Sequence, residues 1–396
     1  MRIVFLVGAR LKPAPTSDEP RKFCLFKMLV LLFLLAIASP APIAAQEATP
    51  EPVMTGAHPV QVFLQRSVDP TGLDRLIFVD GFTGAETTLD VYGERYQATS
   101  ASVMYFDTSR RQVMLAAPDG TTRLHPFITS TAQTRRVDWL LSPDGGSVAW
   151  TLTNSDEFGR LTTVTSVASA DGSNAREVLT DGPRADGLRA LPLAFNAERT
   201  VLYMDLHPDG LSSFLPISQY AGLFALELES GSVTPLPGEE ERGCLCGAGI
   251  GEGQLLRMGL SEDQVGYDLR IYNLVAGAER TTEPLPVPRF RNYTLAGDVL
   301  VSPDGTRAIY SLAQVISANA AQSTVRVIFV LVDLQALTQQ TLTDPVLTFL
   351  RPVAWTDDNT AILFTSPTQD GTWKLQLADG SLPRIAEAAY VGTLLP

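Results

Sequence analysis

Short apolar stretches separated by compact polar turns recur along residues 60–396. In two places the turn reads Ser-Pro-Asp-Gly, at residues 142–145 and 302–305, and an apolar stretch ending in an aromatic residue follows at the same spacing. A degenerate copy of the turn occupies residues 356–359. Proline presets the first dihedral angle of such a turn, aspartate closes it through its side chain, and glycine takes the left-handed position. The pattern therefore predicts β-hairpins.

The hairpins repeat at the spacing expected of propeller blades. Units begin near residues 142, 195, 250, 302 and 356, and second hairpins at residues 171–172, 229–231 and 378–380 give each unit about four strands. Four-stranded units that cannot bury both faces alone pack radially as blades. Because residues 60–137 are long enough for about two more units, we predict an all-β propeller of seven four-stranded blades, with six as the alternative.

The two ends of the repeat region complement each other. The first unit begins with what reads as a second strand, residues 60–64, and lacks an inner one, whereas residues 390–395 form a spare strand. Pairing of these segments would remove two open sheet edges, which are otherwise prone to aggregation. We therefore predict a single propeller domain over residues 60–396 that is closed by its C-terminal strand.

The Ser-Pro-Asp-Gly hairpins resemble the WD40-like repeats of TolB-type β-propellers, repeat by repeat over residues 60–396. The resemblance implies the propeller fold, because the residues that carry it are turn and core residues. It does not extend to the role of TolB in envelope transport, since we find no counterpart of the separate α/β domain that precedes the TolB propeller.

Residues 1–45 read as a secretory signal peptide. Basic residues precede an uninterrupted apolar run of 11 residues, 28–38, and small residues follow it up to Ala45. A membrane-spanning helix needs about 20 apolar residues, so an uncleaved anchor is the weaker alternative. We expect cleavage after Ala45, with Met28 as an alternative start, and a flexible lead-in over residues 46–59. The mature protein would then be secreted or periplasmic and would not stay inserted in a membrane.

The formal net charge excludes some classes of binding partner. Without residues 1–45, which hold six basic and two acidic side chains, the formal net charge falls from −13 to −17. Such an acidic body repels nucleic acids and anionic lipids. The charge thus argues against nucleic-acid partners and against peripheral membrane binding. We expect a monomer that binds a protein or peptide.

Candidate chemistry is sparse. His207 is the one histidine suited to a Ser-His-Asp triad, but its place beside Pro-Asp-Gly favours a turn histidine, and no Gly-x-Ser-x-Gly motif accompanies it. Cys244 and Cys246 would form a disulfide in an exported protein, although the one-residue spacer would strain it, and two free thiols are the alternative. We predict no catalytic, cofactor or metal site, because no local motif for one is present.

An apolar insertion over residues 207–221 is the segment best suited to recognition. Loops normally avoid so much apolar surface, so its side chains either fold back over the ring or contact a partner. We expect an exported binding module for a protein or peptide. The alternatives are a glycan-active hydrolase with carboxylates at the channel mouth and an accessory propeller of a peptidase system. The candidate partner-binding residues in the insertion are Leu211, Phe214, Leu215, Ile217 and Tyr220.

Overall fold

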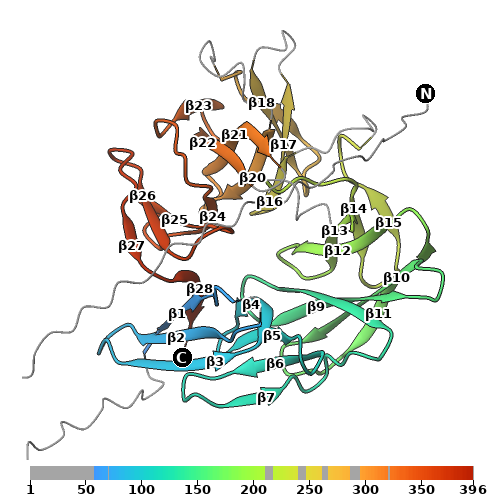
Figure 1. Ribbon diagram of the computed structural model, residues 1–396. Helices are drawn as coiled ribbons and strands as arrows, with labels where there is room; N and C mark the ends of the chain where they lie inside the picture. The colour runs from blue at the N-terminus through green and yellow to red at the C-terminus, as the bar shows by residue number, and fades with distance from the viewer. Residues whose placement is uncertain are drawn as a thin grey trace, which may run out of the picture. The chain divides into compact units, whose positions relative to one another are not determined.

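The computed structural model describes residues 58–69, 71–209, 217–239, 247–260, 266–285, 295–319 and 322–395. In these ranges all regular structure is β-strand, arranged as seven four-stranded antiparallel sheets. None of the described residues forms a helix that is long and apolar enough to cross a membrane. The protein is a seven-bladed β-propeller, which confirms the predicted fold and the preferred blade count (Figure 1).

The blades follow one another in chain order. Blade 1 contains β28 (Ala389–Leu394), β1 (Val60–Gln65), β2 (Asp74–Asp80) and β3 (Glu86–Val91), and blade 2 contains β4 (Gly93–Ala98), β5 (Val103–Asp107), β6 (Gln112–Ala116) and β7 (Thr122–Leu124). Blade 3 contains β8 (Thr134–Leu141), β9 (Ser147–Ser155), β10 (Leu161–Ser169) and β11 (Arg176–Arg184), and blade 4 contains β12 (Leu188–Phe195), β13 (Val201–Pro208), β14 (Leu223–Glu227) and β15 (Val233–Pro235). Blade 5 contains β16 (Ala248–Gly251), β17 (Gln254–Leu260), β18 (Tyr267–Asn273) and β19 (Glu279–Thr281), and blade 6 contains β20 (Leu295–Val301), β21 (Arg307–Asn319), β22 (Gln322–Asp333) and β23 (Thr338–Thr341). Blade 7 contains β24 (Arg351–Trp355), β25 (Ala361–Thr365), β26 (Thr372–Gln376) and β27 (Arg384–Ala386).

The hydrophobic core is divided among the blades. Six buried apolar clusters each combine residues of two consecutive blades; one, for example, joins Ile309 and Phe329 of blade 6 to Ile362 and Phe364 of blade 7. Each sheet therefore buries its faces against its neighbours, as the propeller architecture requires. The strand named first for each blade above, from β28 in blade 1 to β24 in blade 7, lies toward the centre of the ring.

The Ser-Pro-Asp-Gly turns have the geometry that the sequence predicts. In the turn of blade 6, Ser302 Oγ donates to Asp304 Oδ1 at 2.6 Å and accepts from Arg307 N at 3.0 Å, while Gly305 has a φ of 66°. Because the serine hydroxyl stabilises the aspartate carboxylate, the pKa of Asp304 is lowered to about 2. The degenerate turn keeps these contacts with Thr356 and Asp358, and Asn359 takes the glycine position with a φ of 54°.

The C-terminal strand closes the ring, as predicted. β28 pairs antiparallel with β1, with Val60 opposite Leu394 and Leu64 opposite Ala389, and Figure 1 shows the red C-terminal strand beside the blue first strand. Blade 1 is thus assembled from both ends of the propeller. This shared blade accounts for the missing inner strand that the sequence analysis identified.

Candidate functional site in the channel

Two adjoining cavities lie among the inner strands of the propeller. One, of about 240 Å³, is lined by blades 2, 3 and 4 through Arg95, Asp138 and Arg189. The other, of about 350 Å³, is lined by blades 6 and 7 through residues that include Asp298 and Arg351. They share Ser218, Tyr220 and Arg351, and we refer to them together as the channel cavities.

The buried carboxylate of Asp138 holds the arginines of the first cavity. Asp138 Oδ1 accepts a hydrogen bond from Arg95 and lies 3.3 Å from Arg136 Nε, while Asp138 Oδ2 accepts from Arg189 at 2.9 Å. Arg189 is 1% exposed, and its Nε also lies 3.1 Å from Asp209. A buried charge is tolerated only when it is paired. These ion pairs therefore fix arginine heads from three blades around one point.

Shifts in strand register turn the side chains of Arg95 and Asp298 toward the channel cavities. The pairing of β4 with β5 shifts between Glu94 and Gln97, and that of β20 with β21 shifts between Gly297 and Leu300. Within these β-bulges Arg95 has a φ of 61° and Asp298 a φ of 52°, in the left-handed region that side chains disfavour. Bulges re-aim side chains next to functional sites, and backbone strain gathers there. Both irregularities place a charge against the channel cavities.

The second cavity has its own ion pair. Asp298 Oδ1 accepts from Ser218 N at 2.9 Å, and Asp298 Oδ2 lies 3.8 Å from Arg351 Nε. Burial raises the pKa of Asp298, an effect that Arg351 and Ser218 partly oppose. This contact also holds the described C-terminal part of the apolar insertion against blade 6. Gly297 permits the approach, because a Cβ there would lie 2.4 Å from the carbonyl oxygen of Ser218.

His207 lies in β13 rather than in a turn, and its Nδ1 is 3.1 Å from Asp205 Oδ2. Asp205 is buried, and its other oxygen accepts from the backbone N–H groups of Ala221 and Gly222. Ser218 lines the same cavity but interacts with Asp298. Among the described residues, no serine is hydrogen bonded to His207. The pair thus holds a channel side chain in place.

The residues predicted to bind a partner are only partly described. Ile217 is 1% exposed and packs in the apolar cluster of blades 6 and 7, and Tyr220 lines the channel cavities. These two side chains fold back into the ring, one of the two alternatives that the sequence left open. The other three candidates, Leu211, Phe214 and Leu215, lie outside the described residues, as do Cys244 and Cys246. In the described ranges no group of three His, Cys, Asp or Glu side chains is placed to hold a metal ion.

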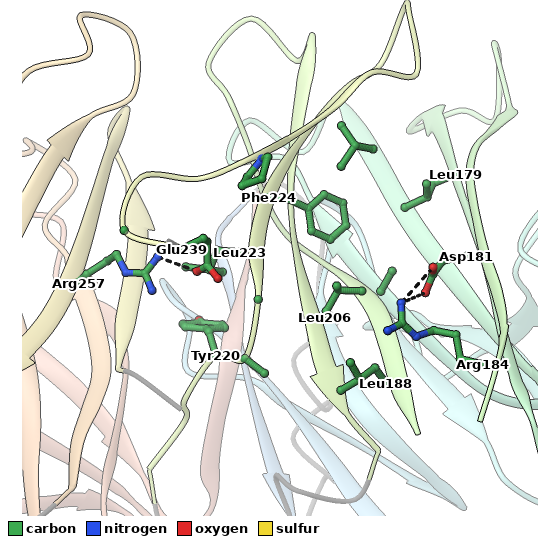
Figure 2. A pocket seen from close by; sticks show the side chains of 16 residues that line it. Leu179, Asp181, Arg184, Leu188, Leu206, Tyr220, Leu223, Phe224, Glu239 and Arg257 are labelled. Carbon is green, nitrogen blue, oxygen red and sulfur yellow. Dashed lines mark hydrogen bonds and ion pairs between the residues drawn. The ribbon is translucent and has the colours of Figure 1, made fainter. Parts of the chain in front are cut away.

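A larger pocket of about 520 Å³ lies at blade 4 and is also lined by residues of blades 3 and 5 (Figure 2). Its middle is apolar, with Leu188, Leu206 and Phe224, and an ion pair lies at each end. Arg184 contacts Asp181 and Asp186, and Arg257 donates to Glu239 at 2.6 Å and to Pro237 O at 3.0 Å. Tyr220 lines both this pocket and the channel cavities. The guanidinium groups of Arg184 and Arg257, at the two ends of the larger pocket, are thus already paired with carboxylates of the protein.

No family model matches the chain, and no match is found among curated proteins. Solved structures do match. A prolyl endopeptidase aligns with a TM-score of 0.54 and 11% identity over 85% of this chain and 50% of its own, so this chain spans about half its length. A TolB-type protein from Agrobacterium tumefaciens aligns with a TM-score of 0.40 and 12% identity, over 73% and 92% of the two chains. An oligogalacturonate lyase in complex with manganese aligns with a TM-score of 0.46 and 9% identity, over 79% and 95%. At such low identity the likeness shows the propeller fold alone.

The sequence analysis did not single out the charged residues of the channel. The sequence does contain one indication of them. A charged side chain inside an apolar strand is expected to be buried, and a buried charge needs an oppositely charged partner. Asp138 and Asp298 each lie four residues before the serine of a Ser-Pro-Asp-Gly turn. The other acidic and arginine side chains that line the channel cavities are Arg66, Arg95, Arg136, Arg189, Asp205 and Arg351.

Proposed function

We propose that the protein is an exported β-propeller that binds a protein or peptide, part of which enters the channel cavities. The proposal rests on the two adjoining channel cavities. Both are lined by apolar side chains and by charged side chains, and ion pairs hold the charged side chains in place. Binding sites are typically preformed and concave, with apolar lining and a few fixed polar groups. Fixing the arginine heads before the ligand arrives reduces the entropy lost on binding.

The proposal includes membership of the WD40-like, TolB-type repeats and export. The recurring Ser-Pro-Asp-Gly turn supports the first, and the leader-like residues 1–45 support the second. N-terminal sequencing of the mature protein should begin near Gln46. Recovery of a chain that still begins at Met1 or Met28 in the membrane fraction would overturn export.

A binding module accounts for the channel better than a glycan hydrolase does. Hydrolysis of glycosides uses two carboxyl groups that face each other across the scissile bond, about 5 to 9.5 Å apart. Each aspartate that lines the described part of the channel cavities instead contacts arginine, histidine or backbone N–H groups. These contacts hold the carboxylates in the framework of the propeller.

The experiment is affinity selection of peptides from a soluble random library by the mature protein. Leu191→Trp would fill the first cavity, and Val275→Trp, at a residue 85% exposed on blade 5, is the matched control. We expect retained peptides to be lost with Leu191→Trp and kept with Val275→Trp, while thermal unfolding confirms that both variants are folded. Retention of no peptide by the unmodified protein, or equal retention by Leu191→Trp, would contradict the proposal.

A further inference from the structure

The channel cavities carry an excess of positive charge in an acidic protein. Five arginines line them, Arg66, Arg95, Arg136, Arg189 and Arg351, against three aspartates, Asp138, Asp205 and Asp298. The whole chain has a formal net charge of −13. Concave sites lined by one sign of charge focus the electric field and attract ligands of the opposite sign. The excess therefore points to an anionic group on the ligand.

Arg95 and Arg136 are the two cations best placed to meet that group. Arg189 is enclosed between Asp138 and Asp209, whereas the side chains of Arg95 and Arg136 are 26% and 36% exposed. Both heads approach the same oxygen, Asp138 Oδ1, so they lie close enough together for one ligand group to contact both. The buried Nε of Arg95 has no hydrogen-bond partner in the described part of the chain, and the Nε of Arg136 faces Asp138 Oδ1 at 3.3 Å.

The surroundings of the two arginines select the chemistry of the ligand. The cavity beside them is lined by the apolar side chains of Leu191, Leu193 and Ile217. Sugar rings are usually bound by stacking on aromatic side chains, yet Tyr220 is the only phenylalanine, tyrosine or tryptophan among the described residues that line the channel cavities. A carboxylate beside an apolar side chain, as peptides provide, matches this lining better than an acidic sugar does.

We infer that Arg95 and Arg136 together bind a carboxylate of the peptide ligand, an inference that rests on the proposed function. Planar guanidinium groups donate paired hydrogen bonds to carboxylates, and such charge-assisted bonds are stronger than neutral ones. The carboxylate belongs either to the C-terminus of the peptide or to an acidic side chain. An apolar side chain of the same peptide packs against Leu191 and Leu193.

Three soluble pools of random N-acetylated octapeptides test the inference by affinity-selection mass spectrometry. One pool has a free C-terminal carboxylate and no acidic side chain, one has a C-terminal amide and a single glutamate, and one has a C-terminal amide and no acid. We expect the first or the second pool to be retained about tenfold or more above the neutral pool. Which of the two is retained identifies the source of the carboxylate.

Variants then connect the preference to the two arginines. Arg136→Gln and Arg95→Gln should each remove the preference for carboxylate. Arg135→Gln is the matched control, because Arg135 is 58% exposed and pairs with Asp209 instead of Asp138. Equal retention of the neutral pool, or an unchanged preference in both Arg136→Gln and Arg95→Gln, would overturn the inference while leaving peptide binding intact. Retention of no pool would overturn the proposed function itself. Displacement of a retained peptide only by a uronic acid oligosaccharide, and not by carboxylate peptides, would overturn the peptide assignment.

Discussion

Removal of the closing strand is the most direct test of how the ring is held together. A chain that ends at Glu387 lacks β28, and a control chain that ends at Leu394 loses only the two residues after the strand. Leu394 is 3% exposed and belongs to the apolar cluster of blades 1 and 2. Removal of a buried leucine side chain costs about 3 to 5 kcal/mol.

The backbone ladder adds to this loss. β28 and β1 align residues from Val60 to Leu64, and each ladder hydrogen bond contributes about 1 kcal/mol. The combined destabilisation is on the order of 5–8 kcal/mol, against a total stability of about 5–15 kcal/mol for typical proteins. The truncated chain should therefore be largely unfolded or aggregated, because β1 would also become an exposed edge.

Urea unfolding followed by tryptophan fluorescence, together with size-exclusion chromatography, measures the effect. Trp139 and Trp150 are each 7% exposed in blade 3, so their emission reports on unfolding of the propeller. The control chain should unfold at the same urea concentration as the full-length protein. If the chain ending at Glu387 also kept that midpoint and remained monomeric, closure by β28 would contribute nothing to stability.

A substitution at Gly392 tests the same closure without shortening the chain. Gly392 has a φ of 153°, and a Cβ there would lie 2.6 Å from the Cβ of Ala98 in β4. Gly392→Val should therefore push β28 away from blade 2 and lower the urea midpoint. Leu395→Val, at a residue 62% exposed, should leave it unchanged.

Three further predictions concern the turns and the insertion. Ser302→Ala removes the hydroxyl that bonds Asp304 and the turn backbone, and should lower the free energy of unfolding by about 1–3 kcal/mol in urea titrations. The pKa values of Asp304 and Asp358 are about 2 in the folded protein, below the ordinary value of 3.8, so stability that is present above pH 4 should decline toward pH 2; Asp304→Asn should weaken that decline in thermal melts at stepped pH. Gly297→Ala would place a Cβ 2.6 Å from Ile217 Cγ2, so it should lower the melting temperature and displace the segment that lines the channel cavities, which reduced peptide retention would reveal.

The blades were predictable because their signals are local. A turn such as residues 302–305 needs only its own residues: proline presets φ, the serine and aspartate side chains close the turn, and glycine tolerates a positive φ. Recurrence of the turn at similar spacing then gives the blade number, and the unmatched strand at each end gives the closure. The turns use residues that are neighbours in the sequence, and the closure follows from the strand that is missing at one end and spare at the other.

The channel cluster was not predictable because its contacts are not local. Arg95 and Asp138 are 43 residues apart, and Asp138 and Arg189 are 51 residues apart. The bulge at Arg95 also shifts the alternation of inward and outward side chains, since one extra residue reverses the faces that follow it. A strict two-residue pattern drawn along β4 therefore cannot tell which side chains face the channel.

Comparison of the blades shows which charged side chains join one blade to the next. Asp138 of blade 3 pairs with Arg189 of blade 4, and Asp298 of blade 6 pairs with Arg351 of blade 7, so in both cases an acid four residues before the turn serine pairs with an arginine of the next blade. These pairs stabilise contacts between blades, since the loss of one partner would leave a buried charge unpaired. By strand register Arg136 lies opposite Thr153 in β9, and the equivalent position of blade 6, opposite Ala313 in β21, is held by the uncharged Leu295. The repeat therefore does not require a charge at this position, and the proposed carboxylate ligand would give Arg136 a role beyond its contact with Asp138.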